Sequence, residues 1–122
     1  MYDSENIFAK ILRGEMECEK IYEDDSVLAF NDKFPDAPVH VLVVPKGEYV
    51  SFDDFAAKAG AETIGSFFEK VAKVARDELG LAENGYRIVS NIGEHGCQFV
   101  PHFHVHILGG AKLGGGAAKI GK

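Results

Sequence analysis

The sequence predicts one α+β domain built around a mostly antiparallel sheet. The length is one reason, because 122 residues are enough for a single hydrophobic core and too few for two domains. The order of periodic segments is a second reason, since a helix, strands, a longer helix and further strands follow one another. Short connections between the paired strands are a third, and they favour antiparallel neighbours.

A short helix is expected at the start of the chain, within residues 4–13. Its apolar side chains lie on one helical stripe, made of Ile7, Phe8, Ile11 and Leu12. Ser4 is the expected N-cap, and Gly14 is the expected end of the helix.

A hairpin and a buried strand follow this helix. In "KIYEDDSVLAFND", Ile21 and Tyr22 begin the hairpin, residues 24–26 form its turn, and residues 27–30 form its second strand. The loop "KFPDAP" then leads to "VHVLVVP", whose β-branched residues predict a buried strand that ends at its proline. This strand contains His40.

The second half of the chain is expected to hold the longest helix and two more strands. Residues 62–79 carry apolar or small side chains at helical spacing, and Gly80 ends this helix. Strands are expected in "YRIVSN" and "VPHFHVHIL", with the turn-rich "IGEHGC" between them. The tail, residues 111–122, is rich in Gly, Ala and Lys and is expected to have no fixed fold.

Composition and charge argue against several classes of function. An apolar content of 46% and a charged content of 26% are typical of soluble proteins, and no apolar run approaches the roughly 20 residues that span a bilayer. A formal charge of −6 argues against a nucleic-acid-binding protein. The acidic start "MYDSENIF" does not look like a secretory signal, so a cytoplasmic protein is expected. Cys18 and Cys97 lack Cys-x-x-Cys spacing and are expected to be reduced thiols.

Three histidines at alternate positions form the most informative motif: His102, His104 and His106. On a strand, alternate side chains share a face, so the three rings are expected side by side on a polar face of a half-buried strand. The residues between them then point into the core. Since the unperturbed pKa of each ring is about 6.5, mutual repulsion disfavours the state in which all three are charged.

One use of such a motif is a metal site. The Cα atoms of His102 and His106 are roughly 13 Å apart on a strand, which is too far for all three rings to bind one zinc ion. A metal would therefore need a ligand from elsewhere, with His40, His95 and Cys97 as candidates. Nucleophilic catalysis fits the spacing better, and no metal is expected.

Nucleophilic catalysis needs a neutral ring and a neighbour that manages protons. His104 could attack an electrophile through a ring nitrogen while a flanking imidazole hydrogen-bonds the leaving group. Backbone N–H groups at Gly93 and Gly96 could approach a phosphate group closely, and Asn91 and Gln98 could donate further hydrogen bonds.

The stretch "NIGEHGCQFVPHFHVHILGG", residues 91–110, resembles the signature of the histidine triad nucleotide-binding family. In that signature three histidines alternate with apolar residues after a glutamine and an earlier asparagine. The resemblance continues upstream through "IFAKILRGEMECEKIYEDDSVLAFNDKFPDAPVHVLVVPK", in the style of the Hint branch of the family. It covers most of residues 6–110, so residues 1–110 are assigned to a histidine triad domain and residues 111–122 to a C-terminal tail.

This resemblance implies a fold and a homodimer. The expected fold is a five-stranded antiparallel sheet with two helices. Two copies are expected to pair through the long helix and a central strand, which gives a continuous ten-stranded sheet.

The resemblance also implies catalytic roles. His104 would attack the α-phosphorus of a purine nucleotide derivative and form a nucleotidyl-histidine that water then hydrolyses. His106 would assist the leaving group and contact phosphate, and His102 and His40 would belong to a supporting proton relay. No metal or other cofactor would be required.

Nucleotide-binding residues follow from the resemblance position by position. Asp32 matches the acid that holds the ribose hydroxyl groups. The apolar side chains that enclose the base are those of Phe8, Ile11, Met16 and Phe30. The phosphate contacts are Asn91, Gln98 and the backbone near Phe99. Phe8 and Ile11 also lie on the apolar stripe of the first helix, and they could equally be ordinary core residues.

Three features depart from the family pattern. Phe99 stands where many Hint-type members have a serine that hydrogen-bonds the scissile nitrogen or phosphate. Lys33 replaces an apolar residue beside the ribose acid and could instead reach a phosphate. The tail lacks the aromatic, proline-containing end of animal members, which reaches the partner's active site.

The leading hypothesis is a hydrolase that cleaves the P–N bond of adenosine or guanosine 5′-monophosphoramidates. One alternative uses the same site to cleave dinucleoside polyphosphates, although the upstream pattern favours the first. Another is a nucleotide-binding regulator whose slow catalysis is incidental, which Phe99 leaves open. The expected partners are a purine nucleotide such as AMP and a second copy of the chain, with no nucleic acid and no membrane.

Overall fold

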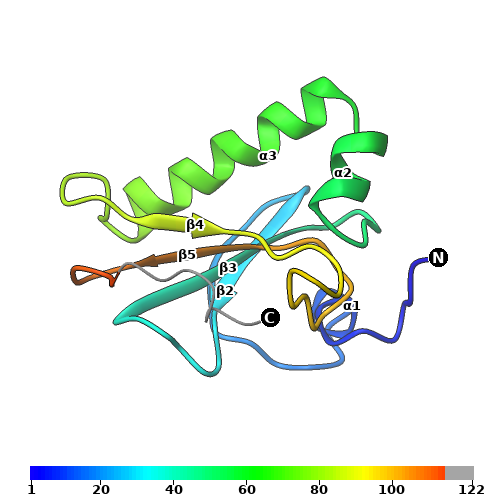
Figure 1. Ribbon diagram of the computed structural model, residues 1–122, viewed down its shortest axis with the longest axis horizontal. Helices are drawn as coiled ribbons and strands as arrows, with labels where there is room; N and C mark the ends of the chain where they lie inside the picture. Colours follow the sequence, from blue (N-terminus) through cyan, green and yellow to red (C-terminus); the bar gives the residue numbers. More distant parts are fainter. Residues whose placement is uncertain (115–122) are drawn as a thin grey trace.

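A five-stranded antiparallel sheet forms the centre of the computed structural model, which describes residues 1–114 (Figure 1). Its strands are β1 (Lys20–Glu23), β2 (Val27–Asn31), β3 (Val39–Pro45), β4 (Arg87–Val89) and β5 (Val105–Gly109). Their order in the sheet is β1-β2-β3-β5-β4, and every neighbouring pair is antiparallel. The predicted sheet is therefore confirmed.

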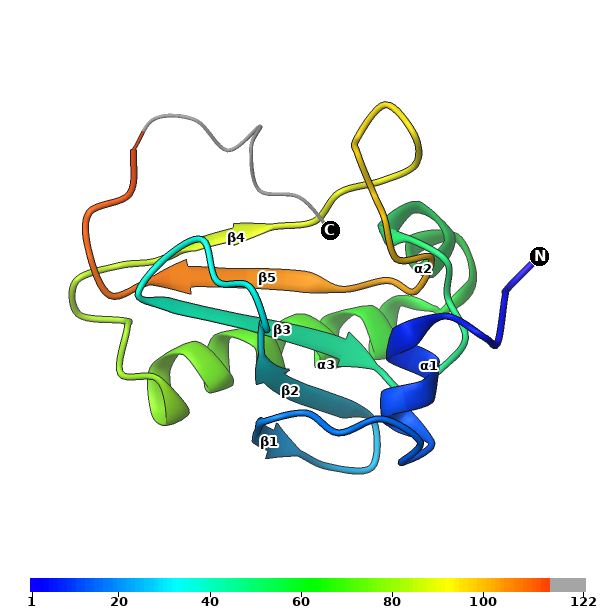
Figure 2. The same ribbon diagram turned by 90° about the horizontal axis from the view of Figure 1, so that it is seen from below.

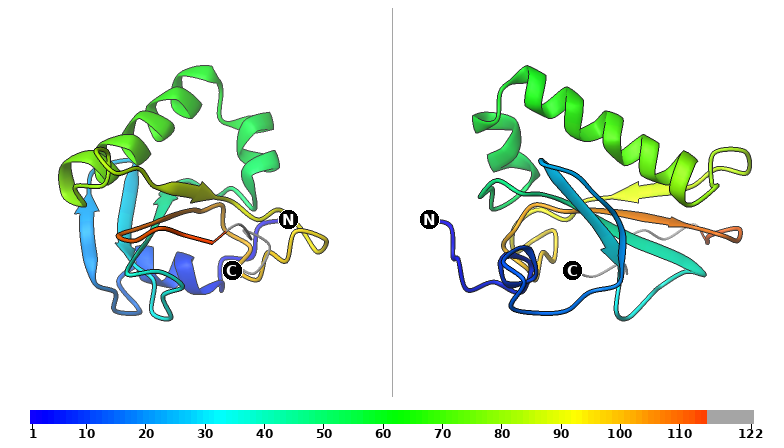
Figure 3. Two further views of the ribbon diagram at one scale, coloured as in Figure 1. Left: turned by 60° about the vertical axis from the view of Figure 1, so that its left-hand side comes forward. Right: turned by 180° about the vertical axis from the view of Figure 1, so that it is seen from behind.

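Helices cover both faces of this sheet. The helices α2 (Phe52–Lys58) and α3 (Ala61–Lys73) lie on one face, while α1 (Ile7–Leu12) lies on the other, beside the end of β3 (Figure 2). Figure 3 shows the same arrangement from two further sides. The last turn of the long helix is a π-helical turn, η1 (Val74–Glu78). Together, α3 and η1 confirm the helix that was predicted at residues 62–79.

The helix α2 adds to the two helices that were expected. It has seven residues, and its buried side chain is Phe55, so it shows too little helical periodicity to be recognised from the sequence. Its start is fixed locally, because the Ser51 side chain accepts a hydrogen bond from the backbone N–H of Asp54 at 3.3 Å.

Two hydrophobic clusters hold the helices on the sheet. The larger cluster, under α2 and α3, includes the side chains of Val41, Val43, Phe55, Phe67 and Phe103. The smaller cluster, under α1, is formed by Phe8, Leu28, Phe30, Leu42 and Val44. Because alternate residues of β3 enter different clusters, this central strand is buried on both faces.

The start of α1 differs from the prediction. Its N-cap is Asn6 rather than Ser4, and the Asn6 side chain accepts a hydrogen bond from the backbone N–H of Ala9 at 2.9 Å. The predicted end is confirmed, since Gly14 has a φ of 79°, a left-handed conformation that glycine adopts without strain.

The start of β5 also differs. The strand begins at Val105, so the residues from 100 to 104 precede it rather than belong to it. The expectation that all three histidines lie on one strand is therefore wrong, since only His106 is within β5. Pro101 has no N–H to pair within a sheet, and the N–H of Phe103 bonds to the Tyr49 carbonyl group at 2.7 Å.

Within residues 1–114, no helix has the length and the apolar character that crossing a membrane requires. The predicted tail starts at residue 111, and its residues 115–122 lie outside the described residues.

Candidate functional site

Four histidine rings lie on the face of the sheet that α1 covers. Their exposed fractions are 2% for His40, 0% for His102, 1% for His104 and 0% for His106. The face is therefore fully buried, and the expectation of a half-buried polar face is wrong. For His104 the reason is α1, whose Phe8 ring packs edge-on against the His104 ring with 4.8 Å between centroids.

Both ring nitrogens of His102 have partners. Nε2 lies 2.8 Å from the Pro45 carbonyl oxygen, which only accepts, so Nε2 carries the proton. Nδ1 lies 2.6 Å from the Tyr2 hydroxyl oxygen. Burial lowers the pKa of His102 to about 4, and the ring is neutral at pH 7. Nδ1 is then an acceptor, and the Tyr2 hydroxyl group donates to it.

The orientation of His104 is fixed by the backbone of His102. Nδ1 of His104 lies 2.7 Å from the His102 carbonyl oxygen, so Nδ1–H is the donor. In the neutral ring the lone pair then belongs to Nε2. This is the tautomer that an imidazole needs in order to attack through Nε2.

His40 and His106 form a hydrogen-bonded pair across β3 and β5. Nδ1 of His40 accepts from the backbone N–H of Asp36 at 2.9 Å, so the proton of neutral His40 is on Nε2. Nε2 lies 2.9 Å from Nδ1 of His106 and must donate to it. His106 is consequently protonated on Nε2, which makes that atom a hydrogen-bond donor.

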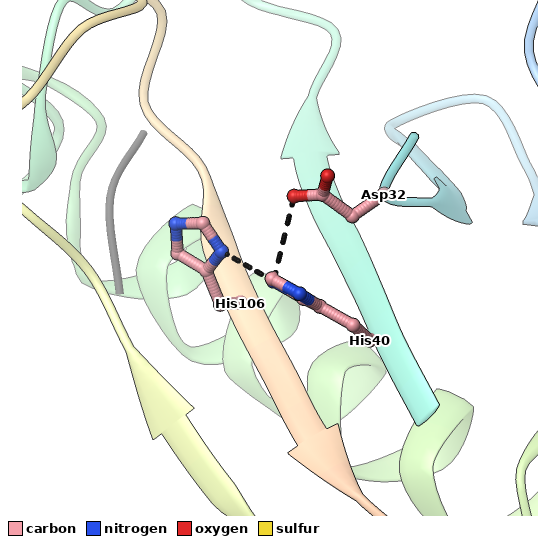
Figure 4. Close-up of side chains that lie close together, drawn as sticks. All are labelled: Asp32, His40 and His106. Carbon is pink, nitrogen blue, oxygen red and sulfur yellow. Dashed lines mark hydrogen bonds and ion pairs between the residues drawn. The ribbon is translucent and has the colours of Figure 1, made fainter. Parts of the chain in front are cut away.

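Asp32 completes this group from the end of β2. Its Oδ2 atom lies 3.4 Å from Nε2 of His40, and its Oδ1 atom accepts from the backbone N–H of Phe34 at 2.8 Å. Figure 4 shows the His40 ring between the Asp32 carboxylate and the His106 ring.

The same three side chains form the one group of potential metal ligands within residues 1–114. Asp32, His40 and His106 each offer one ligand atom, and these atoms lie within 4.8 Å of one another. Two of the three are already joined by the His40–His106 hydrogen bond. His95 and Cys97, which the sequence offered as further ligands, are outside this group, and both are exposed.

A cavity of about 670 Å³ opens next to α1, and its lining includes Asp32 but none of the four buried histidines. Its lining includes every residue predicted to enclose a base, and the predicted ribose acid: Phe8, Ile11, Met16, Phe30 and Asp32. Phe8 therefore belongs to the small core, lines the cavity and contacts the His104 ring. The lining also has polar residues. Lys33 was named in the sequence analysis, whereas the others were not: Glu17, Cys18, Glu19 and Asn31.

The three residues predicted to contact phosphate lie in the loop after β4 and do not line this cavity. The Gln98 amide holds that loop together: Oε1 accepts from the N–H of Gly93 at 3.0 Å, and Nε2 donates to the carbonyl groups of Val50 and Val100 at 2.7 and 2.9 Å. Phe99 is 72% exposed, and Asn91 is half-buried.

The glycines of this loop have a structural reason to be there. Gly93 has a φ of 68°, and a Cβ atom at Gly96 would collide with the backbone of Ile92. Their presence is therefore explained by the turn itself.

The hydrogen bond between the Tyr2 hydroxyl group and His102 could not be predicted from the sequence. That hydroxyl group reaches a ring that is 100 positions away in the chain, and no periodicity or motif links the two residues. Only the fold brings them together.

Comparison with known proteins gives a consistent result. The family model described as the HIT domain matches residues 13–113. The chain is 52% identical over 113 residues to a HIT-like protein of Azospirillum brasilense. The aligned residues cover 93% of this chain and 92% of that protein. The chain is 42% identical over 110 residues to the purine nucleoside phosphoramidase of Escherichia coli strain K12, covering 90% of this chain and 91% of that enzyme.

A solved structure agrees with the fold. The HIT family hydrolase from Clostridium thermocellum superposes with a TM-score of 0.84 at 36% identity, covering 94% of this chain and 98% of that chain.

Proposed function

The chain belongs to the HIT domain family, and from this premise we propose that it is a hydrolase of purine nucleoside 5′-monophosphoramidates. The reaction would break the P–N bond and pass through a nucleotidyl group on His104. The 42% identity to the phosphoramidase of Escherichia coli, along nine-tenths of both chains, supports this substrate class.

The observation that carries the proposal is the hydrogen bond from Nδ1 of His104 to the His102 carbonyl oxygen, at 2.7 Å. It leaves the lone pair on Nε2, the atom that would attack phosphorus. Once Nε2 is bonded to phosphorus, the ring is a cation that keeps its Nδ1 proton. The carbonyl oxygen then stabilises this positive charge through a charge-assisted hydrogen bond.

His106 would act on the other side of the reaction. Its Nε2–H group is a donor, suited to a phosphate oxygen or to the departing nitrogen. His40 keeps His106 in this tautomer by donating to Nδ1. If His106 gives its proton to the departing amine, water then attacks the phosphorus and returns a proton to His106. This releases the nucleoside monophosphate and restores the His104 lone pair.

The nucleotide would lie along the cavity. The apolar walls formed by Phe8, Ile11, Met16 and Phe30 suit a purine ring, and Asp32 suits the ribose hydroxyl groups. The phosphate end would reach the loop after β4, where Asn91 and the backbone of Phe99 are proposed contacts. Gln98 would act through the loop that its amide holds together.

The test is hydrolysis of an adenosine 5′-phosphoramidate with a fluorescent amine leaving group. We expect His104→Ala to lower kcat/KM by about 10³-fold or more, because the attacking atom is lost. His95→Ala is the matched control, since His95 is an exposed histidine outside the buried group, and its activity should equal that of the unaltered protein.

Acid quenching during turnover should trap a nucleotidyl-protein in the unaltered chain and none in His104→Ala. Tight binding of AMP or GMP without any trapped species would instead indicate a nucleotide-binding regulator. Faster turnover of a dinucleoside polyphosphate would indicate the alternative substrate class.

We also propose that the protein forms a homodimer through the edge of the sheet at β4 and is cytoplasmic, as a nucleotide substrate suggests. β4 is an outer strand, and apolar side chains beside it are exposed, with values of 48% for Ile88 and 43% for Ile92. Pairing of two such edges would extend the sheet and cover these side chains.

A further inference from the structure

We propose that Tyr2 is a positioning residue of the site, which holds the His102 ring and, through the His102 carbonyl group, sets the nucleophilic ring of His104. The kinetic part of this inference rests on the proposed function. The hydrogen bond between Tyr2 and His102 does not depend on that function, and a measurement without substrate tests it.

The contact is short and directional. The Tyr2 hydroxyl oxygen lies 2.6 Å from Nδ1 of His102, and the two rings meet edge-on with 5.6 Å between centroids. Since neutral His102 donates from Nε2 to Pro45, Nδ1 is an acceptor and needs a donor in this buried place. Tyr2 supplies that donor.

The contact continues to the reacting atom in two steps. The His102 ring is held at both nitrogens, by Tyr2 on one side and by Pro45 on the other. The carbonyl group of the same residue accepts from Nδ1 of His104 at 2.7 Å. Both contacts belong to one residue, so we expect a change in how the His102 ring is held to alter the carbonyl group that orients His104 and stabilises its cationic form.

Tyr2 is held differently from Pro45. Pro45 belongs to the central strand β3, whereas Tyr2 lies in the segment that precedes α1. The turn that carries Tyr2 toward the site depends on Asn6, whose backbone N–H and side-chain Nδ2 both donate to the Asp3 carbonyl oxygen, at 3.2 and 2.8 Å. The N-terminal segment thus contributes a contact to a site that the core otherwise builds.

Protonation of both partners favours this arrangement. Burial raises the pKa of Tyr2, so its hydroxyl group stays a donor. Burial lowers the pKa of His102, and the hydrogen bond to the Pro45 carbonyl group raises it to a smaller extent. The hydrogen bond that Tyr2 donates to Nδ1 favours the neutral ring. The other titratable or charged groups that act on the pair are His104 beside His102, and Glu48, Arg13 and Asp3 around Tyr2.

The experiment compares Tyr2→Phe with Tyr22→Phe in the full chain. Both variants lose one hydroxyl group that donates a hydrogen bond, but the Tyr22 hydroxyl donates to Asp24, at 2.8 Å, away from the histidines. We expect Tyr2→Phe to lower kcat for the phosphoramidate by about tenfold, with KM unchanged within about twofold. Tyr22→Phe should leave both constants unchanged.

The pH profile separates positioning from a merely structural role. Without the Tyr2 donor the pKa of His102 rises, and a protonated His102 repels the positive charge that develops on His104. The acid-side midpoint of kcat should therefore move to higher pH in Tyr2→Phe and stay in place in Tyr22→Phe. An unchanged kcat and an unchanged midpoint in Tyr2→Phe would overturn the proposal.

A measurement without substrate keeps the two proposals distinguishable. The ¹⁵N shifts of the His102 ring report the tautomer and the pKa directly. We expect the pKa of His102 to be higher in Tyr2→Phe than in the unaltered protein. If the unaltered protein hydrolyses no phosphoramidate, the proposed function fails while this comparison still decides the role of Tyr2. Identical ¹⁵N shifts and identical pKa values of His102 in both proteins would reject the proposed role of Tyr2.

Discussion

At the scale of single residues, the partner of each ring nitrogen decides what a histidine does. His104 and His106 are two positions apart and equally buried, yet the proton lies on Nδ1 of the first and on Nε2 of the second. The difference follows from their partners, a carbonyl oxygen in one case and the Nε2–H of His40 in the other. One ring is thereby prepared to attack and the other to donate.

The burial of His102 predicts a pH-dependent stability. The ring titrates near its ordinary value of 6.5 in the unfolded chain and at about 4 in the folded protein. Between these values the unfolded chain binds more protons, so the free energy of unfolding should fall as the pH is lowered from 6.5 to 4. The full loss from this group is about 3 kcal/mol.

Urea unfolding at pH 7 and at pH 4.5 measures this loss. His102→Gln, which has no titrating ring, should show a smaller decrease between the two pH values than the unaltered protein. His95→Gln should show the same decrease as the unaltered protein, because His95 is exposed. Equal decreases in all three proteins would contradict the assignment to His102.

At the scale of elements, α1 connects stability with the site. It is only six residues long, and such a helix is not stable by itself, so its cap and its packing must hold it. The same helix presents Phe8 to His104 and Ile11 to the cavity. Weakening the helix should therefore affect substrate binding as well as folding.

Asn6→Ala tests this connection. The change removes the cap on Ala9 and the hydrogen bond to the Asp3 carbonyl group, and the loss of the cap alone should lower the free energy of unfolding by about 1 kcal/mol. KM for the nucleotide substrate should rise as the cavity wall loosens. Ser4→Ala is the control, and a loss of stability equal to that of Asn6→Ala would show that the cap is wrongly assigned.

At the scale of the whole molecule, the β4 edge of the sheet and the cavity are made by different residues. The edge at β4 carries the exposed apolar residues Ile88 and Ile92, and a groove between β4 and the helices is lined by Phe52 and Phe68. The cavity is lined by Phe8 and Ile11 of α1, and α1 lies on the face of the sheet opposite α2 and α3 (Figure 2). The proposed dimer edge and the proposed reaction site can therefore be altered separately.

Ile88→Lys should convert the proposed dimer to a monomer, because a charge would be buried between two edge strands. Light scattering coupled to size-exclusion chromatography measures the mass directly. Phe34→Lys is the control, since Phe34 is 70% exposed but lines the cavity, and it should leave the mass unchanged. A monomeric mass for the unaltered protein would contradict the dimer.

The sequence predicts the strands and the long helix well, because their patterns are local. The β-branched run in "VHVLVVP" and the helical spacing over residues 62–79 are each a property of one continuous segment. The short helix α2 and the exact start of β5 escape this reasoning. Phe55 alone gives α2 too little periodicity, and the effect of Pro101 on the strand depends on which neighbour the chain pairs with.

By itself, the sequence determined which histidines are grouped, since spacing along one segment sets which side chains lie near one another. The tertiary structure decided what each ring can do. The tautomers of His104 and His40 are fixed by near neighbours, the His102 carbonyl group and the Asp36 N–H. The other partners lie 57 positions away for Pro45 and His102, 66 for His40 and His106, and 100 for Tyr2 and His102. Contacts at such separations leave no periodic trace in a single chain, because they depend on how the elements pack and not on the order of neighbouring residues.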